Sequence, residues 1–302
     1  MSDKQEIRPE GEELDAFLDE LQKEHKVKEI SGWDSGFPNL NRALDGILPG
    51  LYLLVGRPAI GKTSFGKQLI DQIVMRNSVP GIFFSFTESK KELRIKTLSR
   101  LSGIESREIR RGSAYLLHWY GAPKRSADAE DLPPSWEKVK KSAEAARTWL
   151  DRVYLIECSR ETNMQQIREV FDHVSSAQRS NRAMVVIDDS QRMANHDQRA
   201  NERLHAVSEQ LRDFASNHNT AVVAVWPDVS EPKLPPHVWI DKAPSADVIL
   251  VMESDAERMK KPSESNQAIN LHIVKNRGGE KGKLAFDFFP SFSKFVEASN
   301  DR

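Results

Sequence analysis

The chain has 302 residues, of which 38% are hydrophobic and 29% are charged, and its formal net charge is −1. These values are typical of a globular protein with a polar surface, and they exclude a global basic field that would attract nucleic acid, so any such site must be local. A single cysteine, Cys158, excludes an intramolecular disulfide and a cysteine-based metal cluster.

Residues 1–29 are rich in Glu, Asp and Lys and are expected to form an acidic helical arm, because Leu14, Phe17, Leu18 and Leu21 recur at helical spacing. Two interpretations are open: the arm packs on its own domain, or it docks on a neighbouring subunit. The segment lacks the apolar core of a signal peptide, and no apolar run in the chain approaches the ~18 residues needed to span a bilayer. We therefore expect a cytoplasmic protein that does not contact a membrane.

Residues 30–298 alternate between apolar strands and amphipathic helices. Continuous apolar strands separated by helices predict an α/β domain with a largely parallel sheet that is covered on both faces. A turn-rich RGGEKG segment between the last two strands predicts an antiparallel hairpin at one edge. The expected strands are 51–56, 81–86, 152–157, 183–188, 221–226, 247–252, 269–276 and 283–289, and the expected helices are 63–76, 89–102, 164–178 and 201–218.

Two segments do not follow this alternation. Residues 113–135 carry Pro, Ser and Asp and are expected to be an inserted loop, and residues 227–245 form a Pro-rich loop between two strands. Loops of this length in a compact domain are often functional. Residues 299–302 are expected to be a short tail.

GRPAIGKT at 56–63 fits the phosphate-loop pattern G-x-x-x-x-G-K-[ST] directly after a strand and directly before a helix, which is the context the motif requires. Backbone N–H groups of such a loop bind phosphate oxygens, and the helix N-terminus adds positive potential. The alternative is a chance match in a Gly/Pro turn. The pattern predicts an ATP and Mg²⁺ site in which Lys62 contacts the β and γ phosphates and Thr63 contacts the metal. The expected nucleotide-binding residues are Gly56, Arg57, Pro58, Ala59, Ile60, Gly61, Lys62, Thr63 and Ser64.

Asp188 ends the apolar strand AMVVID, where a second carboxylate is needed to hold the hydrated Mg²⁺. We therefore expect Thr63 and Asp188 to form the metal site. The alternative for Asp188 is a cap after the strand, and the adjacent Asp189 is expected to face solvent.

Four blocks follow one another along the chain: SGFPNLNRALDGILPGLYLLVGRPAIGKTSFG, FFSFTESKKELRIKTLSRLSGI, VVIDDSQRM, and ADVILVM with LHIVKNRGGEKGKLAFDFFPSFSKFVE. Together, from about residue 30 to residue 297, they resemble the C-terminal ATPase domain of DnaB-type replicative helicases. The resemblance implies a RecA-like fold, assembly into hexameric rings around single-stranded DNA, and ATP at subunit interfaces.

The resemblance also implies roles for individual residues. Lys62, Thr63 and Asp188 match the phosphate-loop lysine, the metal-binding hydroxyl and the Walker B acid, and Gln191 matches a glutamine after that strand. Lys275 and Arg277 match a basic pair that reaches into the ATP site of the neighbouring subunit, where an arginine stabilises charge on the transferred phosphoryl group. The alternative for this pair is two solvated cations on an edge strand.

Three features depart from the family pattern. Only residues 1–29 precede the matching region, so we expect the family's amino-terminal domain to be missing. The family's Ser-Leu-Glu-Met-Ser is Ser-Phe-Thr-Glu-Ser here, which puts Thr87 in the place of the catalytic glutamate and Glu88 one residue later. Glu88 is either the base that activates water or an acid in the first turn of the next helix. Trp226 and Pro227 replace a Ser-Gln pair whose glutamine senses the γ phosphate.

In the family, loops after the Walker B strand and after the next strand hold single-stranded DNA. The corresponding segments, 192–203 and 227–239, offer cations suited to phosphates and Trp239 as a stacking surface. The alternative is a pair of solvated loops without nucleic acid. The expected DNA-binding residues are Arg192, Arg199, Arg203 and Lys233.

Three functions compete at this point. The first is a DnaB-like ATPase, helicase or translocase that acts on single-stranded DNA in replication or a related DNA transaction, as a homo-oligomer and with a possible loader or replication protein as partner. The second is a degenerate nucleotide-binding module with slow or no hydrolysis, favoured by Thr87 and Trp226. The third, a RecA-like recombination or clock-type ATPase, shares the core but lacks the KNR-to-FVE ending.

Overall fold

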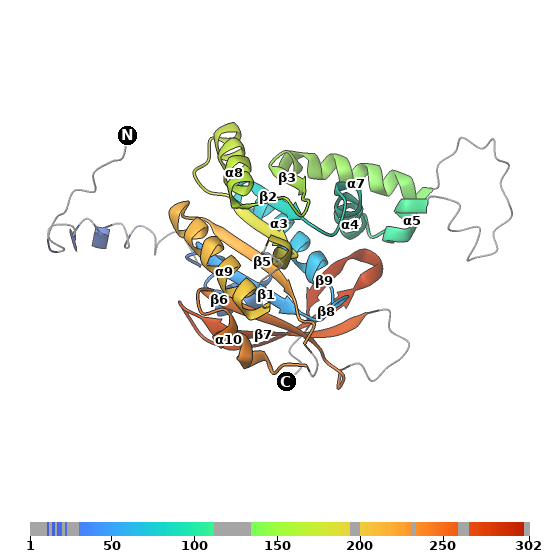
Figure 1. The fold of residues 1–302 in the computed structure, drawn as a ribbon. Helices are drawn as coiled ribbons and strands as arrows, with labels where there is room; N and C mark the ends of the chain where they lie inside the picture. Colours follow the sequence, from blue (N-terminus) through green and yellow to red (C-terminus); the bar gives the residue numbers. More distant parts are fainter. Residues whose placement is uncertain are drawn as a thin grey trace.

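The computed structural model describes residues 11, 14–15, 17–19, 22, 30–111, 134–193, 200–230, 233–258 and 266–298. Within these residues nine strands form one sheet in the order β3-β2-β4-β5-β1-β6-β7-β8-β9 (Figure 1). The strands are β1 (Gly50–Gly56), β2 (Gly81–Ser85), β3 (Val153–Glu157), β4 (Met184–Asp188), β5 (Ala221–Pro227), β6 (Val248–Ser254), β7 (Gln267–Asn276), β8 (Gly282–Phe289) and β9 (Lys294–Glu297).

Six strands, from β3 to β6 in the sheet order, are parallel, and the pairs from β6 to β9 are antiparallel. The prediction of a RecA-like, largely parallel sheet with a C-terminal antiparallel hairpin is confirmed. The structure adds β9 beyond that hairpin, so that β9 and not β8 is the edge of the sheet. Four residues after a Pro-Ser-Phe turn are too short to give a clear strand pattern in the sequence.

Helices cover both faces of the sheet and define two apolar cores. One core lies under α2 (Pro38–Leu44), α3 (Lys62–Asn77), α4 (Lys90–Ser102) and α7 (Pro134–Leu150), and the other under α8 (Met164–Gln178), α9 (Ala200–Asn217) and α10 (Trp239–Lys242). Side chains of β1 alternate between the two cores, as the period of a strand requires: Tyr52 and Leu54 face α3, whereas Leu51, Leu53 and Val55 face α8 and α9.

Several short or late elements were absent from the sequence prediction: α2, α5 (Ser106–Arg111), α7, α10 and the 3-10 turns η1 (Ser190–Met193), η2 (Pro236–Val238) and η3 (Pro290–Phe292). Most of the predicted insertion at 113–135 lies outside the described residues, and α7 begins at its end, at Pro134. The Pro-rich segment 227–245 contains η2 and α10, because Trp239 is buried and anchors it against the core under α9.

The amino-terminal arm is described only in part. Residues 11, 14–15, 17–19 and 22 are helical, and the side chains of Leu14, Phe17 and Leu18 are exposed. Packing of the arm on its own domain and docking on a neighbouring subunit both stay predictions. None of the described helices has the length and apolarity that a bilayer crossing requires.

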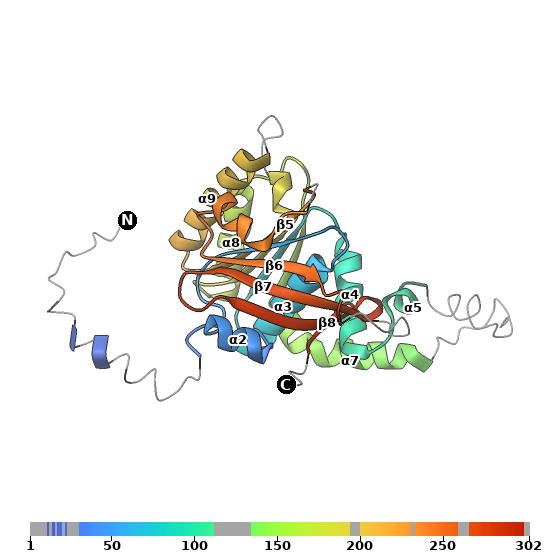
Figure 2. The ribbon, with the colours of Figure 1, turned by 90° about the horizontal axis from the view of Figure 1, so that it is seen from below.

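The C-terminal strands support the loop between β1 and α3 through aromatic packing. Gly61 has φ +100°, and a Cβ atom there would lie 2.8 Å from Cε1 of Phe288 and 2.9 Å from Cζ of Phe295. Gln68 of α3 fixes β9, because its Nε2 donates to Phe295 O (2.9 Å) and its Oε1 accepts from Phe295 N (2.7 Å). Figure 2 shows β6, β7 and β8 side by side on this side of the molecule.

Replacing Gly61 with alanine should destabilise the fold more than the same change at Gly103. Both glycines have positive φ, which costs alanine about 1–2 kcal/mol, but a Cβ at Gly103 meets nothing within 4 Å. The overlap with two buried rings should cost Gly61→Ala a further ~1–3 kcal/mol. Urea unfolding of the two variants measures the difference, and equal losses would show that the rings yield freely.

Candidate functional site

The phosphate loop runs over the carboxyl ends of the parallel strands, from β1 to α3. Two of its residues, Ala59 (φ +65°) and Gly61 (φ +100°), have left-handed backbone, which turns successive N–H groups towards one side. Gly61 is also the residue that precedes the first turn of α3. The loop therefore has the strand–loop–helix form that its sequence predicts.

Lys62 is buried, and its ammonium group folds back over the loop. Nζ donates to Gly56 O at 2.7 Å and to Arg57 O at 2.8 Å. Burial lowers the pKa of Lys62, and the nearby carboxylates of Asp188, Asp189 and Asp228 oppose this shift. The loop carbonyls thus hold a cation at the place where phosphate charge is expected.

Thr63 and Asp188 meet at the centre of the site. Thr63 Oγ1 lies 3.1 Å from Asp188 Oδ1 and 3.0 Å from Oδ2, although 125 positions separate the two residues. Asp188 is only 2% exposed. Burial raises its pKa to about 6; hydrogen bonds from Thr87 and Thr63 oppose the shift, whereas the charges of Glu88 and Asp189 add to it.

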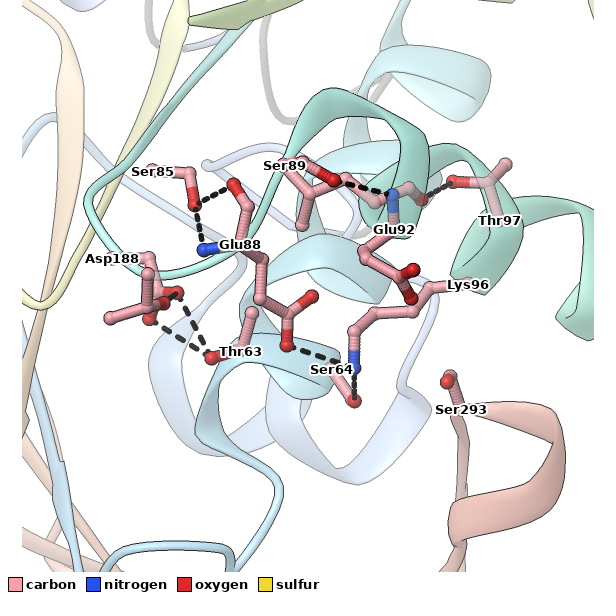
Figure 3. A network of polar contacts seen from close by, with 12 residues as sticks. Thr63, Ser64, Ser85, Glu88, Ser89, Glu92, Lys96, Thr97, Asp188 and Ser293 are labelled. Atoms are coloured by element: carbon pink, nitrogen blue, oxygen red, sulfur yellow. Dashed lines mark hydrogen bonds and ion pairs between the residues drawn. The ribbon is translucent and has the colours of Figure 1, made fainter. Parts of the chain in front are cut away.

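The end of β2 contributes both residues of the altered glutamate position. Thr87 Oγ1 donates to Asp188 Oδ2 at 2.9 Å, and the Glu88 carboxylate lies 3.2 Å from the ammonium group of Lys96 on α4. Figure 3 shows Glu88 between the Thr63–Asp188 pair on one side and Lys96 with Ser64 on the other. Lys96 belongs to no recognisable motif, so sequence reasoning did not identify it as a residue of the site.

This donor set fits a hydrated Mg²⁺ ion next to phosphates. A hydroxyl and a carboxylate are the oxygen ligands that Mg²⁺ takes when water and phosphate complete its shell. Asp189 Oδ1 and Glu88 Oε2 are buried without a hydrogen-bond partner among the described residues. The described residues include no group of three or more His, Cys, Asp or Glu side chains that would hold a metal without such help.

Asp189 is buried at 9% exposure, and Arg192 Nε lies 2.6 Å from its Oδ2. The expectation that Asp189 faces solvent is therefore wrong. Its backbone has φ +64°, which turns the chain from β4 into η1, where Gln191 lies. The sequence did not reveal this turn because few residues other than glycine adopt left-handed backbone, even though aspartate is enriched among them.

Lys275 and Arg277 lie at the amino ends of the parallel strands, opposite the carboxyl ends that carry the phosphate loop. Arg277 N donates to Asp247 O, and Asp247 N donates to Leu51 O, which places Arg277 beside the amino end of β1. The Arg277 guanidinium lies 3.2 Å from Asp247 Oδ1 and is 62% exposed, and Lys275 Nζ donates to Pro244 O at 2.6 Å. The seven residues of β1 separate the two edges, a span of roughly 20 Å, so neither side chain reaches the phosphate loop of its own chain.

At the expected sensor position, Trp226 is buried in the core under α9 and pairs in register with Val55. The end of β5 is instead joined to the loop by polar contacts that sequence reasoning missed. Asp228 N donates to Gly56 O at 2.9 Å, and Arg57 Nη1 donates to Ser230 O at 2.7 Å. The chain after β5 is therefore still in contact with the loop after β1.

Two of the candidate DNA-binding residues are paired with carboxylates. Arg192 pairs with Asp189, Lys233 Nζ lies 2.6 Å from Glu253 Oε1, and Arg203 is half-buried on α9. Arg199 lies outside the described residues. Trp239 is buried, so its predicted role as a stacking surface is wrong.

Changing Asp188 to asparagine should stabilise the protein at high pH when Mg²⁺ and nucleotide are absent. The folded-state pKa of about 6 is above the ordinary value of 3.8, so the stability that this group contributes is present below pH ~3.8 and is lost as pH rises through about 6. We expect Asp188→Asn to unfold with a free energy higher by about 1–3 kcal/mol at pH 8, with the gap closing towards pH 4. Urea unfolding at both pH values measures it, with Asp241→Asn on exposed α10 as a control; a gap that is the same at both pH values would contradict the assignment.

Residues 32–227, more than half of the chain, match the family model described as DnaB-like helicase C terminal domain. The replicative DNA helicase DnaB of Leifsonia xyli subsp. xyli is 23% identical over 303 residues, covering 96% of this chain and 61% of that protein. The chain thus spans about three-fifths of the length of that curated relative, and Lys275 and Arg277 lie outside the family match.

Two solved structures have similar folds. One is described as an ATPase domain and has a TM-score of 0.74 at 19% identity, covering 96% of this chain and 100% of that one. The other, a DnaB-like replicative helicase solved in a study of its interactions with primase, has a TM-score of 0.73 at 18% identity, covering 97% of this chain and 72% of that one. With the phosphate loop, the Thr63–Asp188 pair and the family match taken together, the chain belongs to the DnaB-like helicase C-terminal domain family.

Proposed function

We propose that this chain is an ATP-hydrolysing motor domain that assembles into a ring of identical subunits, a hexamer, and acts as a helicase or translocase on single-stranded DNA. The observation that carries the proposal is the meeting of Thr63 and Asp188 beside the buried Lys62, at the mouth of a loop that has the phosphate-loop sequence. These groups are the ones that bind a nucleoside triphosphate with its metal.

Residues 56–64 would cradle the phosphates of ATP, and Thr63 and Asp188 would hold Mg²⁺ through oxygen atoms. When bound, Mg²⁺ neutralises charge on the β and γ phosphates. Lys62 has three ammonium hydrogens, of which two are donated to loop carbonyls, and the third is available to a phosphate oxygen. The left-handed backbone at Ala59 and Gly61 turns successive N–H groups of the loop towards one side, where the phosphates would lie against the N-terminus of α3.

Hydrolysis requires a water molecule positioned in line with the γ phosphate. Its oxygen bonds to the γ phosphorus as the bond to the bridging oxygen breaks, and the electron pair leaves on ADP. Glu88 is our candidate to accept the proton of this water. Thr87 is an unsuitable base because its hydroxyl has a high pKa and already donates to Asp188.

Completion of the site by a neighbouring subunit explains the place of Lys275 and Arg277. Both lie at the far edge of the sheet, so a second copy would have to bring its phosphate loop against this edge. Arg277 then stabilises charge on the γ phosphate of that copy, and Lys275 assists it. An arginine supplied in this way is worth ~10³–10⁵ in rate in other nucleotide hydrolases.

The partners follow from the relatives and stay proposals for this chain. The curated relatives are named replicative DNA helicases, and one structural relative is described together with primase. We propose single-stranded DNA as the substrate, with Arg192, Arg199, Arg203 and Lys233 as the residues that contact it, and a loader or another replication protein as a partner. A cytoplasmic location is part of the same proposal.

ATP turnover should depend on Lys62 and rise with single-stranded DNA. Lys62→Ala removes the buried cation of the loop, and we expect kcat to fall by at least ~10²-fold. Steady-state phosphate release with and without an oligothymidylate measures both effects. Tight ATP binding with negligible turnover in the unchanged protein would instead support the degenerate, nucleotide-binding module, which membership in the helicase family does not favour.

Arg277→Ala and Lys62→Ala should complement each other when mixed. Each variant alone is inactive, because every interface lacks either the arginine or the lysine. In rings assembled at random from equal amounts of the two variants, one interface in four has both the lysine and the arginine. We therefore expect about a quarter of the ATPase rate of the unchanged protein. Phosphate release from mixed subunits measures this, with exposed Lys281→Ala on the β7–β8 turn as the control for lost surface charge. No recovery in mixed oligomers whose assembly native mass spectrometry verifies would contradict sharing of the site.

A further inference from the structure

The chain after β2 is held in a tight turn that brings Glu88 to the site. Ser85 Oγ accepts a hydrogen bond from Glu88 N at 3.0 Å and donates one to Glu88 O at 2.8 Å. Ser85 is only 2% exposed, so this double contact is anchored in the sheet. A regular strand would direct residues 87 and 88 to opposite faces, whereas in this turn Thr87 Oγ1 donates to Asp188 Oδ2 and the Glu88 carboxylate pairs with Lys96 close to the same site.

The Glu88 carboxylate has one paired and one unpaired oxygen. Oε1 lies 3.2 Å from Lys96 Nζ, and Oε2 is buried without a hydrogen-bond partner in the described part of the chain. The charge of Glu88 also raises the pKa of Asp188, so it acts directly on the expected metal site. A buried carboxylate oxygen without a donor costs free energy unless a ligand such as water supplies one.

Lys96 joins the elements on which the site is built. Its ammonium group donates to Ser64 Oγ at 3.0 Å as well as pairing with Glu88 (Figure 3). Ser64 is buried and follows Thr63 in the first turn of α3. Lys96 is 20% exposed, which leaves its side chain partly shielded from water and limits the positions it can take.

We propose that Lys96 is a positioning residue for ATP hydrolysis: it holds the Glu88 carboxylate in an orientation that presents Oε2 to the attacking water. Ser85 fixes the backbone of Glu88 and Lys96 fixes its side chain, and together they compensate for the one-residue displacement of this acid. Lys96 acts through Glu88 and takes no proton in the reaction. The inference rests on the proposed function, because it requires that this site hydrolyses ATP.

If Lys96 fixes the orientation of the Glu88 carboxylate, removing its charge should lower kcat and leave ATP binding unchanged. Lys96→Met keeps the length of the side chain and removes its charge, and we expect kcat to fall by about 10- to 100-fold, because misorientation of a general base forfeits part of its ~10²–10⁴-fold contribution. KM and the dissociation constant of a fluorescent ATP analogue should change by less than about 3-fold. Lys96→Arg, which can still pair with Glu88 and Ser64, should recover most of the rate. Lys91→Met, on the exposed side of the same helix, is the matched control and should keep the unchanged kcat.

The double variant tests whether Lys96 works through Glu88. Lys96→Met combined with Glu88→Gln should be no slower than Glu88→Gln alone, because the carboxylate that Lys96 orients is already lost. A product of the two single losses would overturn the inference, as would an unchanged kcat in Lys96→Met. A loss of ATP binding in Lys96→Met would also overturn it and would mark Lys96 as a structural or phosphate-binding residue.

The proposed function and this inference can fail separately. Turnover that disappears in Lys62→Ala but persists at full rate in Lys96→Met leaves the ATPase in place and overturns only the role of Lys96. An unchanged protein without Lys62-dependent turnover overturns both.

Discussion

The hydrogen bonds from Thr63 to the buried Asp188 carboxylate join the two parts of the chain on which the site depends. In the sheet, β4 and β1 are separated only by β5, a lateral distance of about 10 Å. The phosphate loop bridges this distance over the end of β5, and Thr63 meets Asp188 there. Because parallel strands share one carboxyl edge, the same topology delivers Thr87 and Glu88 from β2, which is next to β4.

The phosphate loop itself depends on β8 and β9, the last two antiparallel strands of the sheet. Only glycine fits at position 61, because Phe288 and Phe295 leave no space for a side chain there. Gln68 fixes the backbone of Phe295. Phe295 also packs against Phe65 of α3. A change in β8 or β9 is therefore transmitted to the first turn of α3, where Lys62 and Thr63 lie, through close-packed rings and not through a flexible linker.

Sequence patterns were sufficient where a residue's role is set by its neighbours along the chain. The phosphate loop and Asp188 were found because each follows an apolar strand, and the alternation of strands and helices predicted the parallel sheet. Lys96, Asp228 and Trp239 were missed or misjudged because their roles come from contacts between distant segments. Lys96 is 32 positions from Ser64, and on α4 it has the sequence context of any charged surface residue. Helix α7 was missed because it directly follows a Pro- and Asp-rich segment.

The placement of Arg277 would give the proposed oligomer a chemical consequence. Asp247 holds the arginine through its backbone and its side chain, and also pairs with Arg212 of α9 at 2.7 Å. Such contacts reduce the conformational freedom that a long side chain loses on binding, so a second copy that approaches this edge meets a cation already held in place. Asp247 N also donates to Leu51 O, which connects the arginine to the strand that ends in the chain's own phosphate loop. In a ring, the carboxyl end of each β1 would then lead into the phosphate loop of its own subunit, and Arg277, held beside the amino end of β1, would serve the ATP site of the next subunit.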